Sequence, residues 1–336
     1  MQAFKQCHQV HKLHRHIIPT AVMSLLLLCT PVFAMNLSSE PISPVPTDNR
    51  FNADKVSLGR TLFHDPRLSS DNSISCASCH NLKQGGADDA KVSVGVRGEP
   101  GTANTPTVFN SSLNFVQFWN GRAADLTEQV NGPVHNPVEM DANWPLIVSR
   151  LNQDPALGQR FETLYPDGVN ADNIRDAITE FERSLLTLNA PFDRWLRGEE
   201  SALSDEQKNG YRLFKSYGCI SCHQGTNVGG NMYAPFGAVK DIAEYFNARG
   251  TSLTETDLGR YSATNDTADR YLFKVPSLRL ASLTAPYFHD GSVKELESAI
   301  KIMGRFQLGR EIPAEHITAI SSFIESLQGN HPELNR

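Results

Sequence analysis

Apolar residues recur at helical spacing in the longer segments of this chain. In residues 171–188 charged residues separate the apolar ones, which are Ile174, Ala177, Ile178, Phe181, Leu185 and Leu188. This spacing predicts an amphipathic helix. The run Ser204-Asp205-Glu206-Gln207 predicts the capped start of another helix, and residues 314–327 have the pattern of a last amphipathic helix. No run of alternating apolar and polar residues indicates strands, so the pattern predicts a mainly α protein.

The first 34 residues have the pattern of a secretory signal peptide. Lys5, Lys12 and Arg15 precede the apolar run 21–29, and Val32-Phe33-Ala34 predicts cleavage after Ala34. The alternative is a retained membrane anchor, but the apolar run is short for a bilayer span. We therefore do not expect an integral membrane protein. Residues 35–50, which are rich in Pro, Ser and Asn, predict an extended leader.

The motif C-x-x-C-H occurs twice, as Cys76-Ala77-Ser78-Cys79-His80 and as Cys219-Ile220-Ser221-Cys222-His223. It is the attachment signature of a c-type haem, in which both sulfurs bond the porphyrin and the histidine binds the iron. On a helix, positions i, i+3 and i+4 share one face, so all three side chains reach the same group. A single C-x-x-C would also suit zinc or a redox disulfide. Two copies, each followed by histidine, predict two covalent haems.

Other blocks of the chain repeat with the motifs. Leu58–Phe63 precedes the first motif and is matched by Asn209–Phe214 before the second, and two further pairs of blocks follow in the same order. Ordered blocks with unequal connecting loops indicate two copies of one fold. We therefore expect two cytochrome c-like haem domains related by internal duplication, over residues 51–189 and 190–336.

Composition narrows the compartment and the partners. Four of the six cysteines lie outside the predicted signal peptide, and all four belong to the haem motifs, so no disulfide framework remains. An exported protein with covalent haem predicts the bacterial periplasm. Without its first 34 residues the chain has 28 basic and 37 acidic residues, a net charge of −9. This balance gives no indication of nucleic-acid binding. It suits a small basic redox partner, and it is equally explained by solubility.

The sixth position of each iron decides between electron transfer and chemistry. In the second copy, Met303 lies about eighty residues past the motif and would raise the reduction potential as a ligand opposite His223, with Met232 as the competing candidate. The equivalent region of the first copy has Glu139, His135 and Met140 instead. A carboxylate above an open haem can move a proton between the two oxygens of peroxide. The alternative is a surface glutamate beside a turn.

The chain resembles the bacterial di-haem cytochrome c peroxidases over nearly all of residues 55–330. The matching segments include Asp65–Ser69, Asn104–Thr107, Gln117–Ala123, Gly132–Val134, Val138–Met140, Ala190–Arg194, Thr284–His289 and Ile302–Gly304. The resemblance implies reduction of hydrogen peroxide to water, with electrons from a small cytochrome c or a cupredoxin. Members of this family are often dimeric, so a homodimer is one open state of assembly.

The resemblance also assigns roles to individual residues. The haem on His80 would cleave peroxide, and the haem held by His223 and Met303 would accept electrons. Glu139 matches the acid–base glutamate of the family, Gln129 matches a glutamine of the peroxide pocket, and Trp119 matches a tryptophan between the haems. Simple packing is the alternative for Trp119. A calcium ion is also implied, with the Asn104 side chain and the carbonyls of Thr284 and Pro286 as ligands.

One position departs from the family pattern. Many members have a histidine about sixteen residues beyond the first motif, and it caps the peroxidatic iron until the other haem is reduced. Here Val96 lies near that position, and no histidine occurs between His80 and His135. We predict that the first haem is open in the oxidised protein and needs little reductive activation. The remaining alternative for a cap is His135.

Two other functions fit parts of the pattern. A di-haem cytochrome that only transfers electrons would have two six-coordinate haems, and Glu139 near an uncapped iron argues against it. A di-haem oxidase that modifies another protein would have a tyrosine at the position of Met303. We therefore favour the peroxidase.

Overall fold

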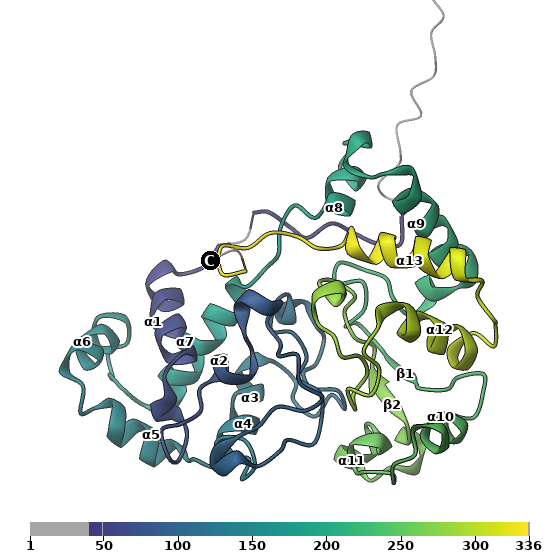
Figure 1. Ribbon diagram of the computed structural model, residues 1–336. Helices are drawn as coiled ribbons and strands as arrows, with labels where there is room; N and C mark the ends of the chain where they lie inside the picture. Colours follow the sequence, from purple (N-terminus) through teal and green to yellow (C-terminus); the bar gives the residue numbers. More distant parts are fainter. Residues whose placement is uncertain (1–39, 49, 335–336) are drawn as a thin grey trace, which may run out of the picture. The chain divides into compact units, whose positions relative to one another are not determined.

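A computed structural model describes residues 40–48 and 50–334, so the predicted signal peptide and its cleavage site at Ala34 lie outside the described residues. Helices predominate in this part of the chain (Figure 1), which confirms the mainly α prediction. The helices are α1 (Ala53–Phe63), α2 (Cys76–Cys79), α3 (Leu126–Gln129), α4 (Asn131–His135), α5 (Trp144–Leu151), α6 (Pro155–Leu164), α7 (Ala171–Ser184), α8 (Pro191–Leu196), α9 (Asp205–Tyr217), α10 (Ile242–Arg249), α11 (Tyr261–Thr264), α12 (Leu296–Gln307) and α13 (Ala314–Glu325). The strands β1 (Tyr233–Pro235) and β2 (Leu272–Lys274) pair antiparallel. Among these elements we find no helix with the length and apolar character needed to cross a membrane.

The predicted helices are present, with one clear difference in length. Ser204 caps α9 as expected, because its hydroxyl accepts from the Gln207 N–H while the Gln207 side chain accepts from the Ser204 N–H. Helix α13 ends two residues before the predicted boundary. Helix α7 ends at Ser184, although the apolar pattern continues to Leu188. Leu188 instead exchanges backbone hydrogen bonds with Asn330, a partner that local periodicity does not reveal.

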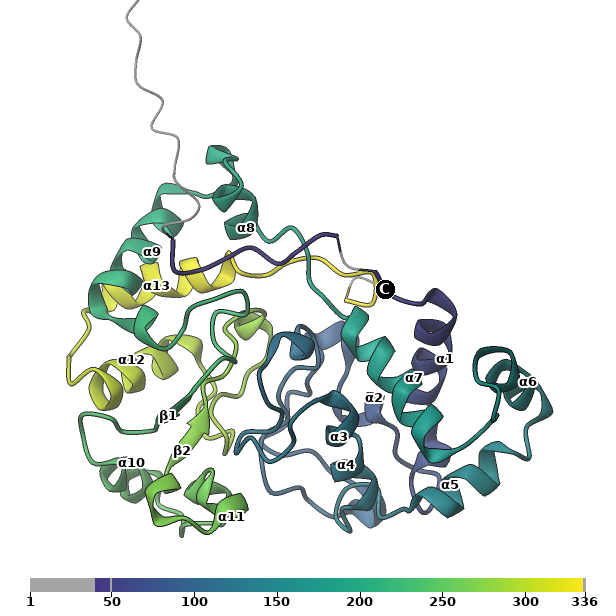
Figure 2. The same ribbon diagram turned by 180° about the vertical axis from the view of Figure 1, so that it is seen from behind.

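Two pairs of helices pack in the same way. Helix α1 lies beside α7, and α9 lies beside α13 (Figures 1 and 2). Gly59 allows the first pair to meet, since a Cβ at this position would lie 1.9 Å from the carbonyl oxygen of Ala177. Gly210 has the same role in the second pair, where a Cβ would lie 1.9 Å from the carbonyl oxygen of Ala319. The two glycines occupy matching positions in the repeated blocks of the sequence.

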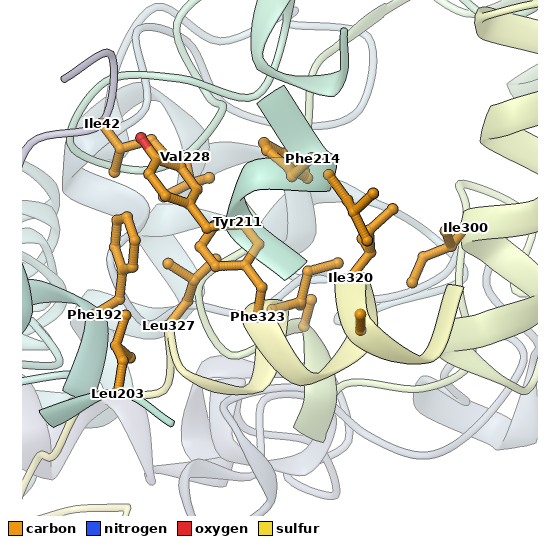
Figure 3. Close-up of a cluster of buried hydrophobic side chains, with 14 of the residues drawn as sticks. Ile42, Phe192, Leu203, Tyr211, Phe214, Val228, Ile300, Ile320, Phe323 and Leu327 are labelled. Atoms are coloured by element: carbon orange, nitrogen blue, oxygen red, sulfur yellow. The ribbon is translucent and has the colours of Figure 1, made fainter. Parts of the chain in front are cut away.

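Each helix pair is covered by its own apolar cluster. Figure 3 shows the cluster around α9 and α13, in which the rings of Phe192, Tyr211 and Phe323 pack edge-to-face or tilted with centroids about 5 Å apart. A second cluster joins α1 and α7 to α5 and α6, and its fully buried members include Leu58, Leu62, Ile147, Phe161 and Ile174. Cys219 and Ile220 of the second haem motif pack against the cluster around α9 and α13. Cys76 and Ala77 of the first motif pack against a separate cluster that contains Phe63 and Phe181.

The described part of the leader, residues 40–48, contains no helix or strand, but it is packed against the C-terminal half of the chain. Ile42 and Val45 are 1% and 0% exposed. The Val45 N–H donates to a carboxylate oxygen of Asp193 at 3.2 Å, and Arg279 donates to the Ser43 carbonyl at 3.2 Å. The low apolar content of residues 35–50 gave no indication of this burial.

The C-terminal tail packs in the opposite sense, against elements of the N-terminal half. The Glu333 carboxylate accepts from the Arg60 guanidinium at 2.7 Å, and the ring of His331 lies edge-on to Phe109. Leader and tail therefore each bind the half of the described chain to which they are not adjacent in sequence.

Candidate functional site

The structure contains two large cavities, and each has one C-x-x-C-H motif in its wall. The first has a volume of about 800 Å³ and is lined by Cys76, Cys79 and His80. The second has a volume of about 630 Å³ and is lined by Cys219, Cys222 and His223. Both volumes fall in the range of small-molecule and cofactor pockets, roughly 300–1,000 Å³.

Short helical turns bring the motif side chains to the cavities. In the first motif the His80 N–H donates to the Cys76 carbonyl at 2.9 Å, at the end of α2. The second motif forms a 3-10 turn over Cys219–Ser221, and the His223 N–H donates to the Cys219 carbonyl at 3.0 Å. Each motif therefore presents two sulfurs and one imidazole to its own cavity.

The two histidines are held in the form that binds a metal. His80 Nδ1 lies 3.1 Å from the carbonyl oxygen of Gly86, and His223 Nδ1 lies 3.3 Å from that of Val228. Because a carbonyl only accepts, Nδ1 carries the proton, and Nε2 keeps its lone pair for an iron. Burial lowers the pKa of both rings, to about 4 for His223, so the neutral ligand form is favoured.

The cysteines also fit covalent haem. All four in the described chain are free, and burial raises the pKa of each thiol, to about 11 for Cys219. A zinc site brings three or four ligand atoms together, whereas thioether formation needs only free thiols beside the porphyrin. Among the described residues, the group of side chains close enough to hold a metal ion is Asp257, His289 and Asp290, which includes no cysteine. The residues present therefore fit two haems better than zinc or disulfides.

Glu139 lies in the wall of the first cavity, together with Gln129 of α3. Its Oε1 accepts from Asn136 Nδ2 at 2.7 Å. Burial raises the pKa of the Glu139 carboxyl, while the positive charge of Arg122 and the hydrogen bond from Asn136 oppose this rise. The Glu139 side chain is therefore partly buried in the cavity wall, and it is not a fully exposed surface glutamate.

Val96 is fully buried, and it is not part of the cavity wall. Its N–H donates to the Glu139 carbonyl at 2.9 Å. The neighbouring Gly95 lies against the same loop, since a Cβ there would be 2.2 Å from the Val138 carbonyl oxygen. The segment that would carry a capping histidine is thus bonded to the loop that carries Glu139.

Among the described residues, His80 is the one histidine in the wall of the first cavity. His135, the alternative cap, is exposed, and its ring packs edge-on against Trp144 with centroids 6.1 Å apart. In this arrangement the first cavity contains no second imidazole.

The second cavity has two methionines in its wall, Met303 from α12 and Met232. Met303 packs beside the aromatic cluster that contains Phe236 and Phe306. Both thioethers face the cavity that contains His223, so the wall by itself does not choose between them. Met303 as the axial ligand stays a prediction.

Trp119 belongs to the walls of both cavities, as do Asn104 and Phe273. Its indole N–H donates to the Asn104 carbonyl at 2.8 Å, and its own carbonyl accepts from the Lys274 N–H at 2.9 Å. Hydrogen bonds therefore hold both the indole ring and the backbone of Trp119 where the two cavities share a wall.

The residues predicted to bind calcium are found in the wall of one cavity. Asn104, Thr284 and Pro286 all line the second cavity. The Asn104 Nδ2 donates to the Ala90 carbonyl at 3.2 Å, and we find no hydrogen bond to its Oδ1 in the described chain. The free amide oxygen and the two backbone segments fit an oxygen-ligand cation.

The wall of the first cavity also contains a buried carboxyl that the sequence patterns did not single out. Glu182 of α7 is 5% exposed, its Oε2 has no partner among the described residues, and burial raises its pKa to about 8. A signal was present, because Glu182 is four residues after Ile178 and three before Leu185, on the apolar face of its helix.

Comparisons with known proteins support the interpretation of the two cavities as haem sites. The family model for di-haem cytochrome c peroxidase matches residues 53–201. The chain is 48% identical over 292 residues to the cytochrome c peroxidase Ccp of Escherichia coli strain K12, covering 87% of this chain and 62% of that protein. It is 42% identical over 297 residues to the cytochrome c551 peroxidase of Nitrosomonas europaea, covering 88% of this chain and 86% of that protein. The crystal structure of a MauG-like protein associated with microbial copper homeostasis superimposes with a TM-score of 0.74 and 26% identity, over 88% of this chain and 96% of that one.

Fold, motifs and cavities define a c-type cytochrome with two haem sites. The chain belongs to the di-haem cytochrome c peroxidase family. The family match confirms the resemblance that the sequence motifs indicated. Members of this family that are named as peroxidases are oxidoreductases that act on hydrogen peroxide.

Proposed function

We propose that this chain reduces hydrogen peroxide to water in the first cavity and takes in electrons at the second. The observation that carries the proposal is that Glu139 and Gln129 share a wall with His80, whereas His223 shares a wall with methionines. Bound haem would supply an iron that accepts peroxide in the first cavity and an iron that accepts single electrons in the second. The remaining steps belong to the side chains.

Glu139 is the proton carrier. Asn136 holds its Oε1, which leaves Oε2 to take a proton from one oxygen of the peroxide and to return it to the other, so that the O–O bond can break and the protonated oxygen leaves as water. The remaining oxygen would leave as a second water once two protons from solvent and two electrons from the donor protein have been added. This requires the ionised carboxylate at the start. The positive charge of Arg122 and the Asn136 hydrogen bond favour that form against the cost of burial. Gln129 is placed to orient the peroxide with its amide.

Trp119 is the relay between the two sites. Its ring lies in the wall that both cavities share, and hydrogen bonds from the indole N–H and to its carbonyl fix its position. The His223 site, with Met303 as the second ligand, is the entry for electrons from a small cytochrome c or a cupredoxin. The net negative charge of the chain favours a basic donor.

The remaining sequence-based assignments are part of the proposal. They are a periplasmic location after removal of residues 1–34, a calcium ion held by Asn104, Thr284 and Pro286, and two haem domains over residues 51–189 and 190–336. The matched helix pairs around Gly59 and Gly210 support the two-domain assignment.

The decisive experiment is steady-state peroxide reduction by the holoprotein with a reduced c-type cytochrome, comparing wild type with Glu139→Gln. Glutamine keeps the size of the side chain but does not carry the proton, so we expect turnover to fall about 10²–10⁴-fold. The absorption spectrum of both haems is the control for intact attachment. Unchanged turnover in the variant would remove Glu139 from this role.

Electron paramagnetic resonance of the oxidised protein tests whether the first site is open. Because His80 is the only imidazole in that wall within the described chain, we expect a high-spin signal and full activity without prior reduction. Two low-spin haems, one of them with bis-histidine character, would show that a histidine caps the first iron after all.

A further inference from the structure

Lys274 is a buried cation that the proposed chemistry does not use. It ends β2, opposite Tyr233 of β1, and lies in the wall of the second cavity. Its side chain is 7% exposed. A lysine is almost never buried to this extent unless its ammonium group is paired.

No partner for this ammonium group is present in the described chain. Neither a hydrogen bond nor an ion pair of Lys274 Nζ is formed, and burial lowers the pKa of the amine to about 8 with no neighbouring acid to oppose the shift. The wall of the second cavity has no aspartate or glutamate. The described residues therefore do not supply an anion for Lys274.

The other cation in this wall has its positive charge paired with a carboxylate of the protein. Arg279 is fully buried, and its guanidinium donates to Asp193 at 2.9 Å and to the Thr226 carbonyl at 2.6 Å. Its charge is already neutralised, so Arg279 does not need an anion from the cavity. Lys274 does.

The group that fills the second cavity is the source of that anion. Every haem carries two propionate carboxylates, and a carboxylate is the usual partner of a buried ammonium group. We propose that Lys274 binds a propionate of the haem in the second cavity and thereby raises the reduction potential of that haem. The inference rests on the second haem that the family implies, and it is independent of the peroxide chemistry proposed above.

The internal repeat shows that a lysine occupies this position in one copy only. At the offset that aligns the repeated blocks, Lys274 corresponds to Asn104, and Trp119 corresponds to His289. The backbone contacts are reciprocal, because Lys274 N–H donates to Trp119 O at 2.9 Å and Asn104 N–H donates to His289 O at 2.9 Å. Equivalent backbone positions thus carry a cation beside the second cavity and a neutral amide in the other copy.

The direction of the effect follows from charge. Reduction adds an electron to the haem, and a nearby positive charge stabilises the reduced form. A cation held in a dry wall acts more strongly than one in water, since screening by solvent and salt is weak there. Lys274 would therefore make the second haem the better electron acceptor of the two, as an electron entry site requires.

The test is a spectroelectrochemical titration of both haems in the holoprotein, which needs no peroxide. In Lys274→Met we expect the equilibrium between oxidised and reduced second haem to shift about tenfold toward the oxidised form, or about 59 mV for a one-electron couple. Lys274→Arg, which keeps the charge, should stay near the wild-type value. Lys301→Met is the matched control, because it removes the same charge from an exposed position of α12.

The resonance Raman bands of the haem propionates give a second measurement. Loss of the ammonium partner should shift the propionate bending band in Lys274→Met but not in Lys301→Met. If the methionine variant fails to mature, Lys274→Gln is titrated instead, since glutamine keeps a polar group without the charge. An unchanged second potential in both variants, or an equal shift in Lys301→Met, would overturn the proposal. Neither outcome would affect the proposed peroxidase activity, which the Glu139→Gln assay tests separately.

Discussion

Glu139 is held between two opposing influences. Burial in the wall of the first cavity favours its neutral form, and Arg122 together with Asn136 favours the carboxylate. Arg122 itself is placed by a contact of its guanidinium with the Phe118 ring, at 3.3 Å from the ring centroid. The proton affinity of the carboxyl is therefore set by a neighbour that does not need to touch the substrate.

This balance predicts the pH dependence of an Arg122→Met variant. Removing the positive charge leaves burial less opposed, so the pKa of Glu139 rises further above its ordinary value. Since the ionised form must be present at the start, kcat/KM should fall at acidic pH, and the acidic limb of its pH profile should move to higher pH. Measured profiles of the wild type, Arg122→Met and the charge-retaining Arg122→Lys decide the point. A limb that stays in place in Arg122→Met would show that another group sets it.

Among the elements, the two matched helix pairs approach each other too closely for a side chain at the contact. Helices α1 and α7 meet at Gly59, and α9 and α13 meet at Gly210, each with a neighbouring carbonyl where a Cβ would be. Helix propensity alone would favour alanine over glycine in the middle of a helix. The close approach of the helices explains why glycine is present there.

We predict that Gly59→Ala destabilises the holoprotein. The added Cβ would clash with the Ala177 carbonyl oxygen, and overpacking of this kind costs about 1–3 kcal/mol. Thermal or denaturant unfolding measures the effect. Gly158→Ala in α6 is the matched control, because no atom lies within 4 Å of its Cβ position, and it should be neutral or stabilise by up to about 1 kcal/mol. Equal behaviour of the two variants would contradict this account of the helix contact.

In the whole molecule, contacts between segments that are distant in the sequence hold the walls of the two cavities in place. The leader packs on the C-terminal half through Ile42 and Val45, and the tail returns to the N-terminal half through Glu333 and Arg60. Asn104 lies in the walls of both cavities. A cation at Asn104 would therefore tie together segments that are far apart in the sequence.

This arrangement predicts the effect of removing calcium. Treatment of the holoprotein with a chelator should slow electron transfer between the haems and lower peroxide turnover several-fold. Without the ion, the backbone segments around Trp119 are held less firmly. Both haems should stay attached, since their thioether bonds do not depend on the ion. Turnover and metal content before and after chelation measure the effect, and calcium but not magnesium should restore activity. A protein that contains no calcium when fully active would exclude the site.

Much of the fold was predictable because its signals are local. The apolar spacing of residues 171–188 and the cap at Ser204 depend on neighbours within a few turns, and both helices are present. The end of α7 was not predictable, since Leu188 leaves the helix to pair with Asn330. The burial of the leader was missed for the same reason, because its partners Asp193 and Arg279 come from distant segments.

By itself, the sequence determined the mainly helical fold and the family and predicted the haem attachment, since these follow from short motifs and from periodicity. The tertiary structure decided what each ionisable group experiences. Glu139 and Glu182 share the wall of the first cavity, while Lys274 stands without an anion in the second. The physical reason is that burial and charge pairing depend on which distant segments meet, and a residue's neighbours in sequence do not reveal them.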